Sequence, residues 1–151
     1  MLPLSEKYKV IEPLTEEEFD EYYILRWSIL RKPWNQPVGS EIDFNESTSR
    51  HGLILNSNKK AIAVCRIEMR DIVTAQIRYM AVSEECRGQG LGRKILHYLE
   101  NKARHLGARR IYLDARENAV EFYRSCGYRI TKNSYLLFGE IQHYGMEKSI
   151  S

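Results

Sequence analysis

The sequence has few cysteines and no long hydrophobic run. Its 151 residues include Cys65, Cys86 and Cys126, which form no Cys-x-x-Cys pair and do not cluster with the four histidines. This usage predicts a reduced, cytoplasmic protein without a structural metal site. The longest apolar stretches, such as residues 61–65, fall far short of the ~20 residues that span a bilayer, and residues 1–10 lack the apolar segment of a secretory signal. We therefore expect no membrane partner.

An excess of charge of one sign is also missing. The net charge of +3 comes from 23 basic and 20 acidic residues that alternate along the chain. Nucleic-acid-binding domains usually gather basic residues on one face, so we expect no nucleic-acid partner; salt-sensitive binding to RNA or DNA would test that alternative. Residues 87–94 are an exception, because they hold three basic residues and no acid, which suits a small polyanion. The 43% hydrophobic content excludes disorder, and the length predicts one domain over residues 1–151.

The periodicity of apolar residues predicts an α/β (α+β) chain with a mixed sheet. Residues 7–14 indicate a short strand that ends at Pro13. Thr15 and Glu18 have the spacing of a capping box, which begins a helix that Pro33 ends near Arg31. The remaining elements are predicted as strands at 51–55, 61–69 and 75–82, a helix at 90–106, a strand at 111–113, a helix at 117–125, and strands at 128–138 and 141–146. The apolar stripe of the long helix is Leu91, Ile95, Leu99, Ala103 and Leu106, and Gly107 is its expected C-cap.

The segment that bears most on function joins the strand at 75–82 to the helix at 90–106. It contains the alternating glycines Gly88, Gly90 and Gly92. Glycine allows a tight turn, and the unpaired N–H groups at a helix start attract an anion such as a pyrophosphate. The segment is neither a P-loop, since no Gly-Lys-Ser/Thr follows, nor a dinucleotide fingerprint, whose glycine spacing differs. A glycine-rich turn without a ligand is the alternative.

Two motifs in this order resemble those of a known family. Met80-Ala81-Val82 followed by Arg87-x-x-Gly90-x-Gly92 resembles motif A of the GNAT superfamily of acyl-CoA N-acyltransferases, and residues 117–128 resemble its motif B. The resemblance covers nearly the whole chain. It implies the GNAT fold, a mostly antiparallel twisted sheet flanked by helices. It also implies an enzyme that uses acetyl-CoA as co-substrate, without a metal, to acetylate a primary amine of a small molecule or peptide by direct attack.

A narrower resemblance concerns the flanking segments. Residues 26–43, Ala115-Arg116-Glu117 and residues 141–143 resemble the ElaA-like branch, and still more the acetyltransferase-like half of bacterial proteins that also carry a thioesterase-like half. This leaves an alternative function open, a non-catalytic acyl-CoA-binding or regulatory module that partners another enzyme.

The family's cofactor-binding residues carry over by position. The resemblance implies that the backbone of Met80, Ala81 and Val82 pairs with the pantetheine arm. It implies that main-chain amides hold the pyrophosphate, with Arg87 and Arg93 adding charge; these amides belong to Gly88, Gln89, Gly90, Leu91, Gly92 and Arg93. The chain departs from the family at Arg116, seven residues before Tyr123, where many members have Asn.

Three residues are candidates for catalysis. Tyr123 matches the motif B tyrosine that lies near the CoA sulfur, where it would protonate the leaving thiolate, or else it is a core aromatic. Glu41 lies with Asp43 in the polar loop 32–47 and is either a base or substrate ligand, or an ordinary loop acid. His143 has a side-chain type whose pKa suits a general base, or else it is a hydrogen-bonded structural group. Exposed strand edges allow a monomer or a homodimer.

Overall fold

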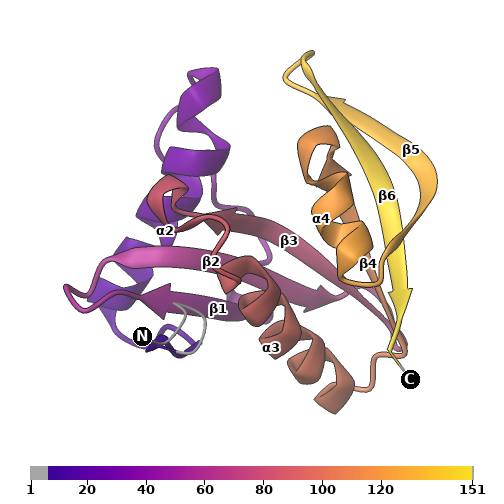
Figure 1. The fold of residues 1–151 in the computed structure, drawn as a ribbon, viewed down its shortest axis with the longest axis horizontal. Coiled ribbons are helices and arrows are strands. Elements are labelled where there is room, and N and C mark those ends of the chain that lie inside the picture. Colours follow the sequence, from indigo (N-terminus) through magenta and orange to yellow (C-terminus); the bar gives the residue numbers. More distant parts are fainter. Residues whose placement is uncertain (1–6, 151) are drawn as a thin grey trace.

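A six-stranded mixed sheet organises the protein, whose computed structural model describes residues 7–150 (Figure 1). The strand order is β1-β2-β3-β4-β6-β5, and every neighbouring pair is antiparallel except β3 and β4, which are parallel. The strands are β1 (Arg50–Leu55), β2 (Ala61–Met69), β3 (Thr74–Val82), β4 (Arg110–Arg116), β5 (Arg129–Leu137) and β6 (Ile141–Ser149). The helices are α2 (Glu16–Leu30), α3 (Leu91–His105) and α4 (Val120–Ser125).

The helix ends follow the local sequence as predicted. Thr15 Oγ1 accepts a hydrogen bond from the Glu18 amide at 3.1 Å, and the Glu18 carboxylate accepts from the Thr15 amide at 3.1 Å, which completes the capping box of α2. Arg31 is the C-cap of α2, two residues before Pro33. Gly107 follows α3 with a φ of +95°. Leu106, expected on the buried stripe of α3, is instead its exposed C-cap residue, because it lies beyond the last helical turn.

The strand predicted at 7–14 is wrong in extent. Only Ile11 pairs with the sheet, in an isolated antiparallel bridge to Leu53 with both N–H···O distances at 2.8 Å. Pro13 has no N–H to donate, so the ladder does not extend past it. The predicted helix at 117–125 also divides, since Glu117–Ala119 form a 3₁₀ turn before α4 begins. The other predicted strands and helices are confirmed, with ends that differ by a few residues.

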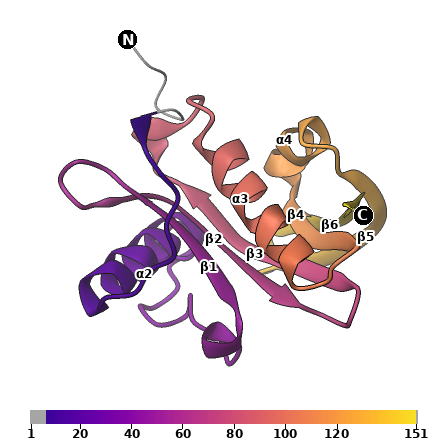
Figure 2. The ribbon, with the colours of Figure 1, turned by 90° about the horizontal axis from the view of Figure 1, so that it is seen from below.

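The helices cover the two faces of the sheet. Figure 2 shows α2 and α3 on opposite sides of β1, β2 and β3. On the α2 face, Tyr22 and Leu25 pack with Leu53, Val64 and Ala81. On the other face, α3 and α4 bury a larger cluster that contains Ile54, Cys65, Ile67, Ile95, Leu99, Val120 and Tyr123. Side chains of successive strand residues therefore point into the two cores alternately, as the two-residue period of a strand requires.

The sheet opens between β3 and β4. Their ladder runs only from Thr74↔Arg110 to Ile77↔Leu113, although both strands continue beyond it. On the β2 side, β3 carries one extra residue between the pairs Val64↔Ala81 and Arg66↔Arg78, which is a β-bulge. Tyr79 lies in this bulge with a φ of +58°. The bulge bends β3 away from β4, and the gap between the two strands positions the site described next.

Candidate active site

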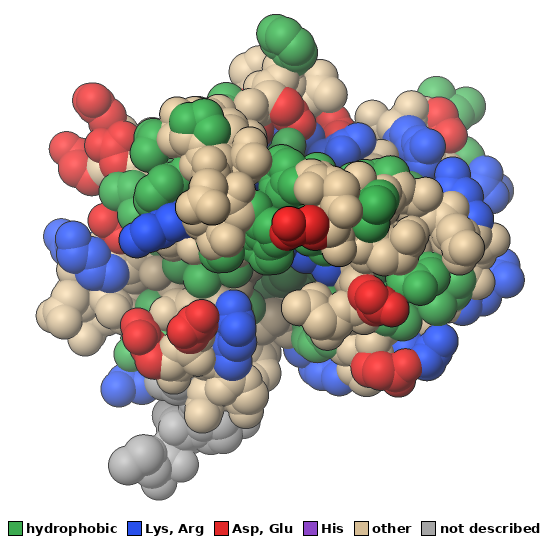
Figure 3. Space-filling view, turned by 90° about the horizontal axis from the view of Figure 1, so that it is seen from above, with side chains coloured by type: hydrophobic (Ala, Val, Ile, Leu, Met, Phe, Trp, Pro, Cys, Tyr) green, Lys and Arg blue, Asp and Glu red, His purple; other side chains and the backbone are tan. Residues whose placement is uncertain are grey.

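A cavity of about 850 Å³ lies where β3 and β4 separate. Its wall includes the second half of β3, the start of α3, α4, the end of α2, and side chains of β5 and β6. Seen from above, hydrophobic side chains gather in a hollow between the two halves of the molecule, with acidic and basic side chains at its rim (Figure 3). The cavity therefore combines an apolar floor with polar groups from several distant segments.

The glycine-rich turn forms one end of the cavity. Gly88 and Gly90 have φ values of +76° and +82°, and an added Cβ at Gly88 would meet no atom within 4 Å. Gly90 is the N-cap of α3 without a side-chain hydrogen bond, and the first helical bond runs from the Lys94 amide to the Gly90 carbonyl at 3.1 Å. The amides that precede Lys94 in the helix therefore have no partner within α3 and can bind an anion.

Two arginines flank this turn. Arg87 donates from Nε to the Val82 carbonyl at 3.3 Å, and Arg93 donates to the Ser125 carbonyl and hydroxyl at 3.3 and 3.0 Å. Both line the cavity, and neither forms an ion pair with a carboxylate of residues 7–150. Gly92 brings α3 against α4, since a Cβ there would lie 3.2 Å from Phe122 Cζ.

The backbone of β3 forms the long wall of the cavity. Met80, Ala81 and Val82 all line it, and they lie past the last residue of β3 that pairs with β4. Their edge on that side is therefore open to an extended ligand, which could add to the sheet as a short strand would. Of the predicted cofactor-binding residues, all but Gln89 line the cavity; Gln89 belongs to the same turn.

Tyr123 reaches the cavity from α4. Its ring packs edge-on against Phe122 and Tyr128, with centroid distances of 5.1 and 5.9 Å. Within the described part of the chain its hydroxyl has no hydrogen-bond partner, although the side chain is buried. Burial raises the pKa of Tyr123 well above its ordinary value. The hydroxyl therefore keeps its proton near neutral pH and can act as a hydrogen-bond donor.

His143 reaches the cavity from β6. Its ring stacks on Tyr135 at a centroid distance of 4.3 Å, and Nδ1 lies 3.0 Å from the Ile141 carbonyl oxygen. Because a carbonyl only accepts, Nδ1 carries the hydrogen and Nε2 keeps its lone pair in the neutral ring. Burial lowers the pKa of His143 below 6.5, and the charge of Arg116 lowers it further, against the Ile141 hydrogen bond, which raises it. The imidazole is thus neutral near pH 7 and can accept a proton.

Glu41 does not line the cavity. Its carboxylate is buried in its own loop, where Oε1 accepts from the Gly39 amide at 2.8 Å, and its backbone carbonyl accepts from Arg26 Nη1 at 2.9 Å. Asp43 pairs with Arg66 at 2.7 Å. The structure therefore brings Tyr123 and His143 together at the cavity and leaves Glu41 outside it.

A buried ionic network lies behind the bulge of β3 and has no counterpart in the sequence analysis. Arg26 and Arg66 are fully buried, and both bind Glu46 Oε2, at 2.9 and 2.8 Å. Their guanidinium carbons lie 4.3 and 5.0 Å from the centre of the Tyr79 ring, whose hydroxyl donates to Asp43 at 3.1 Å. The only indication of this network in the sequence is Arg26, which lies on the apolar face of the first helix.

The described residues contain neither a metal-binding cluster nor a membrane-spanning helix. Among residues 7–150, no three His, Cys, Asp or Glu side chains are grouped so that they could hold a metal ion. No helix in the same range has the length and apolar content needed to cross a bilayer. The three cysteines are free.

Comparisons with known proteins agree with this architecture. The profile of the acetyltransferase (GNAT) family matches residues 14–128. The uncharacterized N-acetyltransferase YjcF of Bacillus subtilis is 29% identical over 140 residues, which cover 93% of this chain and 99% of that protein. Escherichia coli ElaA has the same fold, with a TM-score of 0.81, 24% identity and coverage of 94% and 99%. An aminoglycoside 6′-N-acetyltransferase complexed with coenzyme A aligns with a TM-score of 0.77, 16% identity and coverage of 95% and 97%.

A mixed sheet that splays beside a glycine-capped helix defines the acyl-CoA N-acyltransferase fold. The chain belongs to the GNAT acetyltransferase family and is an acyltransferase.

Proposed function

We propose that this protein is an acetyl-CoA-dependent N-acetyltransferase, which moves the acetyl group to a primary amine of a small-molecule or peptide acceptor. The observation that carries the proposal is that one cavity joins an anion-binding glycine turn, an open strand edge, a protonated tyrosine and a neutral histidine. We propose residues 1–151 as a single N-acetyltransferase domain that acts in the cytoplasm as a monomer or homodimer. The free cysteines and the one shared sheet support this.

The residues of the cavity fit two parts of coenzyme A, its pyrophosphate and its pantetheine arm. The turn from Gly88 to Arg93 would hold the pyrophosphate through main-chain amides, and Arg87 would add positive charge. The open edge at Met80–Val82 would hydrogen-bond the amides of the pantetheine arm. When bound, acetyl-CoA supplies an acyl thioester, which is already activated toward an amine.

The protein's own groups would then align the reactants and move protons. A backbone N–H near Met80–Val82 would polarise the acyl carbonyl oxygen. His143 would accept the proton that the amine loses as its nitrogen bonds to the acyl carbon, directly or through water. Tyr123 would donate its proton to the sulfur as the carbon–sulfur bond breaks. Holding both substrates in one cavity supplies much of the rate gain by proximity.

Two glycine variants test the binding half of this proposal. Gly88→Glu places a carboxylate in the turn, while Gly39→Glu is a matched control, because Gly39 also has a positive φ of +102° and open space around its Cβ position. Isothermal titration should show acetyl-CoA binding to the wild type and to Gly39→Glu. The affinity of Gly88→Glu should be at least ~100-fold lower, because the new carboxylate would lie in the anion-binding turn and repel the pyrophosphate. Equal affinity in Gly88→Glu would contradict the proposed site.

An acceptor screen tests the catalytic half. Free CoA release from acetyl-CoA is followed by a thiol reagent with amino acids, polyamines, aminoglycosides and peptides as acceptors. The proposal expects release that depends on an amine and that falls in Tyr123→Phe, while acetyl-CoA affinity stays the same. Acetyl-CoA binding without turnover of any amine would instead indicate the non-catalytic binding module.

A further inference from the structure

Two arginines from distant elements converge at the cavity. Arg31 caps the end of α2, and Arg116 is the last residue of β4. Both line the cavity, and both donate to the same acceptor, the Leu30 carbonyl, from Arg31 Nη1 at 3.0 Å and from Arg116 Nη2 at 3.0 Å. The two guanidinium groups are therefore neighbours, although the two residues are 85 positions apart in the sequence.

These arginines differ from other arginines near the cavity in having no acidic partner. Arg26, Arg66 and Arg78 each pair with a carboxylate within 3.1 Å. In residues 7–150, Arg31 and Arg116 donate three hydrogen bonds in all, each to a backbone carbonyl, and form no ion pair. An arginine has five N–H donors, so most of theirs remain available to a ligand.

The electrostatics of the pair favour an anion. Burial lowers the pKa of Arg116, and the positive charge of Arg31 lowers it further. Two like charges held together in a partly buried site repel each other, and a carboxylate between them would relieve both the repulsion and the loss of hydration.

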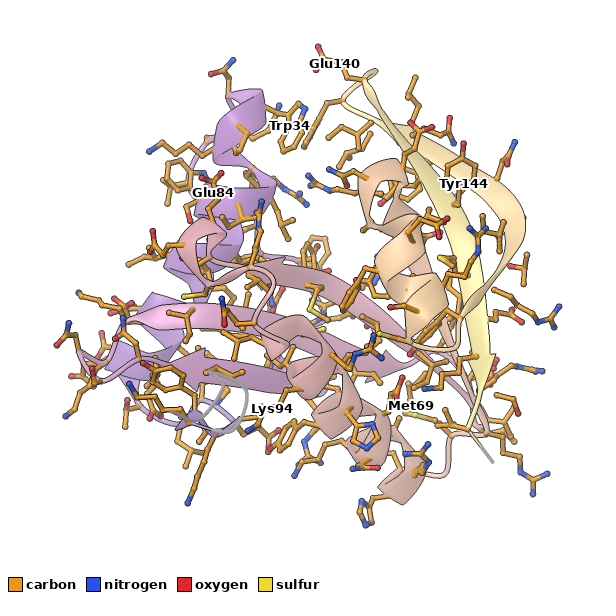
Figure 4. All side chains as sticks on the ribbon, in the orientation of Figure 1. Trp34, Met69, Glu84, Lys94, Glu140 and Tyr144 are labelled. Atoms are coloured by element: carbon orange, nitrogen blue, oxygen red, sulfur yellow. The ribbon has the colours of Figure 1, made fainter. Side chains whose placement is uncertain are left out.

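Aromatic rings fix the positions of the two guanidinium groups. Arg116 lies over the Trp34 ring at 4.6 Å, and Arg31 lies 5.7 Å from the Tyr79 ring centre and 5.6 Å from that of Phe138. None of these rings belongs to the glycine turn. In Figure 4, Trp34 lies just beyond the end of α2, and Glu140 lies at the tip of the facing β5–β6 hairpin. The pair is thus built into the mouth of the cavity between α2 and the hairpin.

We propose that the acceptor is an amine that also carries a carboxylate, which Arg31 and Arg116 bind while the amine points toward His143. This inference rests on the proposed function. Arginine forks match the planar geometry of a carboxylate with paired hydrogen bonds, and here the forks are held in place before the ligand arrives. The substrate class is that of amino acids and related amino carboxylic acids.

The test compares matched acceptors that differ only in the carboxylate. The pairs are 4-aminobutyrate with 1-aminopropane, L-phenylalanine with phenethylamine, and L-lysine with cadaverine. For at least one pair, the acid should have the higher kcat/KM in the wild type. Arg31→Gln and Arg116→Gln should each lower kcat/KM for that acid by ~10- to 100-fold and leave the decarboxylated amine unchanged, because each removes charge-assisted hydrogen bonds.

Three controls make the result decisive. Arg110→Gln removes an arginine at the other end of β4, where its Nε donates to Thr74 outside the cavity, and should change nothing. Arg116→Lys keeps the charge but loses the fork, so its kcat/KM should lie between those of the wild type and Arg116→Gln. The dissociation constant for acetyl-CoA should be the same in all variants; a rise in Arg31→Gln or Arg116→Gln would assign the pair to the cofactor and overturn the inference.

Direct binding separates this inference from the proposed function. Ligand-observed NMR with CoA-saturated protein should show binding of the acids that depends on both arginines. If the acids bind in this way but no amine is acetylated, the proposed function fails and the carboxylate subsite stands. If the decarboxylated amines bind and react as well as the acids, or if the arginine variants weaken both alike, the subsite is overturned while N-acetylation stands.

Discussion

Tyr79 holds a backbone conformation that an aromatic residue rarely adopts. Its φ of +58° lies in the left-handed region, at the bulge that separates β3 from β4. Conformations of this kind cost of order 1–3 kcal/mol and persist where the surroundings fix them. Here the surroundings are the Arg26 and Arg66 guanidiniums against the ring and Asp43 on the hydroxyl. The ionic network thus shapes the cavity without lining it.

Asp43 links this network to acid stability. Burial alone would raise its pKa, but the hydrogen bond from Arg66, the hydrogen bond from the Asn45 amide and the charge of Arg66 together outweigh burial and lower the pKa from 3.8 to about 2. A lowered pKa means that Asp43 contributes its full stabilisation above about pH 4, and that this contribution is lost as the pH falls toward 2. We expect Asp43→Asn to lower the free energy of unfolding by about 1–2 kcal/mol at pH 7.

Denaturant unfolding at pH 7 and at pH 3 measures this effect. The difference between Asp43→Asn and the wild type should shrink at pH 3, because Asp43 of the unfolded chain, with its ordinary pKa of 3.8, is then mostly protonated while the folded chain still keeps it ionised. Asp20→Asn on the exposed face of α2 is the control and should leave stability nearly unchanged. A difference that is constant between the two pH values would refute the ionic origin of the stabilisation.

His143 gives a prediction about the pH dependence of activity. Its lowered pKa means that the neutral, proton-accepting form dominates above an apparent pKa that is lower than 6.5. kcat/KM should therefore rise with pH through that value, and His143→Gln should lower kcat by ~100-fold or more and remove this acidic limb. Rate profiles from pH 5 to 9 measure it, with His97→Gln on the exposed side of α3 as the control. An acidic limb that survives in His143→Gln assigns the base elsewhere.

Among the elements, the approach of α3 to the sheet depends on a missing side chain. Gly52 in β1 faces α3, and a Cβ there would lie 3.0 Å from Ile95 Cγ1 and 3.6 Å from Leu99 Cγ. Gly52→Ala should therefore push the helix outward and lower the free energy of unfolding by about 1–3 kcal/mol. Thermal or denaturant unfolding measures the loss.

A double variant distinguishes crowding from other effects of the same change. Ile95→Val shortens the side chain that meets the new Cβ, so Gly52→Ala combined with Ile95→Val should be less destabilised than the sum of the two single changes. Strict additivity would show that the two residues do not compete for the same space.

Element positions could be predicted from the sequence because their causes are local. The capping box at Thr15, the stripe on α3 and the glycines at 88 and 90 each depend on residues a few positions apart. The bulge at Tyr79 and the short parallel ladder could not be predicted, because both depend on pairing between strands. The position of Glu41 could not be predicted for the same reason. The sequence shows only a carboxylate in a polar loop, and the fold shows that this carboxylate accepts a hydrogen bond from the Gly39 amide.

The two sides of the cavity also differ in how far they could be predicted from the sequence. Its cofactor side follows a contiguous motif, which is why nearly every predicted residue from Met80 to Arg93 lines it. Its other side is assembled from the end of α2, the end of β4 and the β5–β6 hairpin. Arg31 and Arg116 meet there only in three dimensions. In the sequence, Arg116 stands out only as a departure from the family motif.

In the molecule as a whole, the cavity lies between two halves that share one continuous sheet. One half holds β1, β2, β3, α2 and α3, and the other holds β4, β5, β6 and α4 (Figure 1). The direct ladder between the halves is the short β3–β4 pairing, and polar bonds reinforce it, among them Tyr128 and Lys148 to Glu100 at 2.8 and 3.1 Å. A ligand in the cavity touches both halves, so its binding energy adds to the stability of the whole fold.

This architecture predicts how acetyl-CoA changes thermal unfolding. A ligand that binds only the folded state at about 100 times its dissociation constant adds about 2.7 kcal/mol to the free energy of unfolding. For a chain of this size the melting temperature should rise by roughly 5–10 °C, in a single transition, because both halves contact the ligand. Scanning calorimetry with increasing acetyl-CoA measures the rise. Gly39→Glu should show the same rise, and Gly88→Glu should show a rise of at most about 1–2 °C at the same acetyl-CoA concentration. An equal rise in Gly88→Glu would mean that the ligand stabilises the protein from another site.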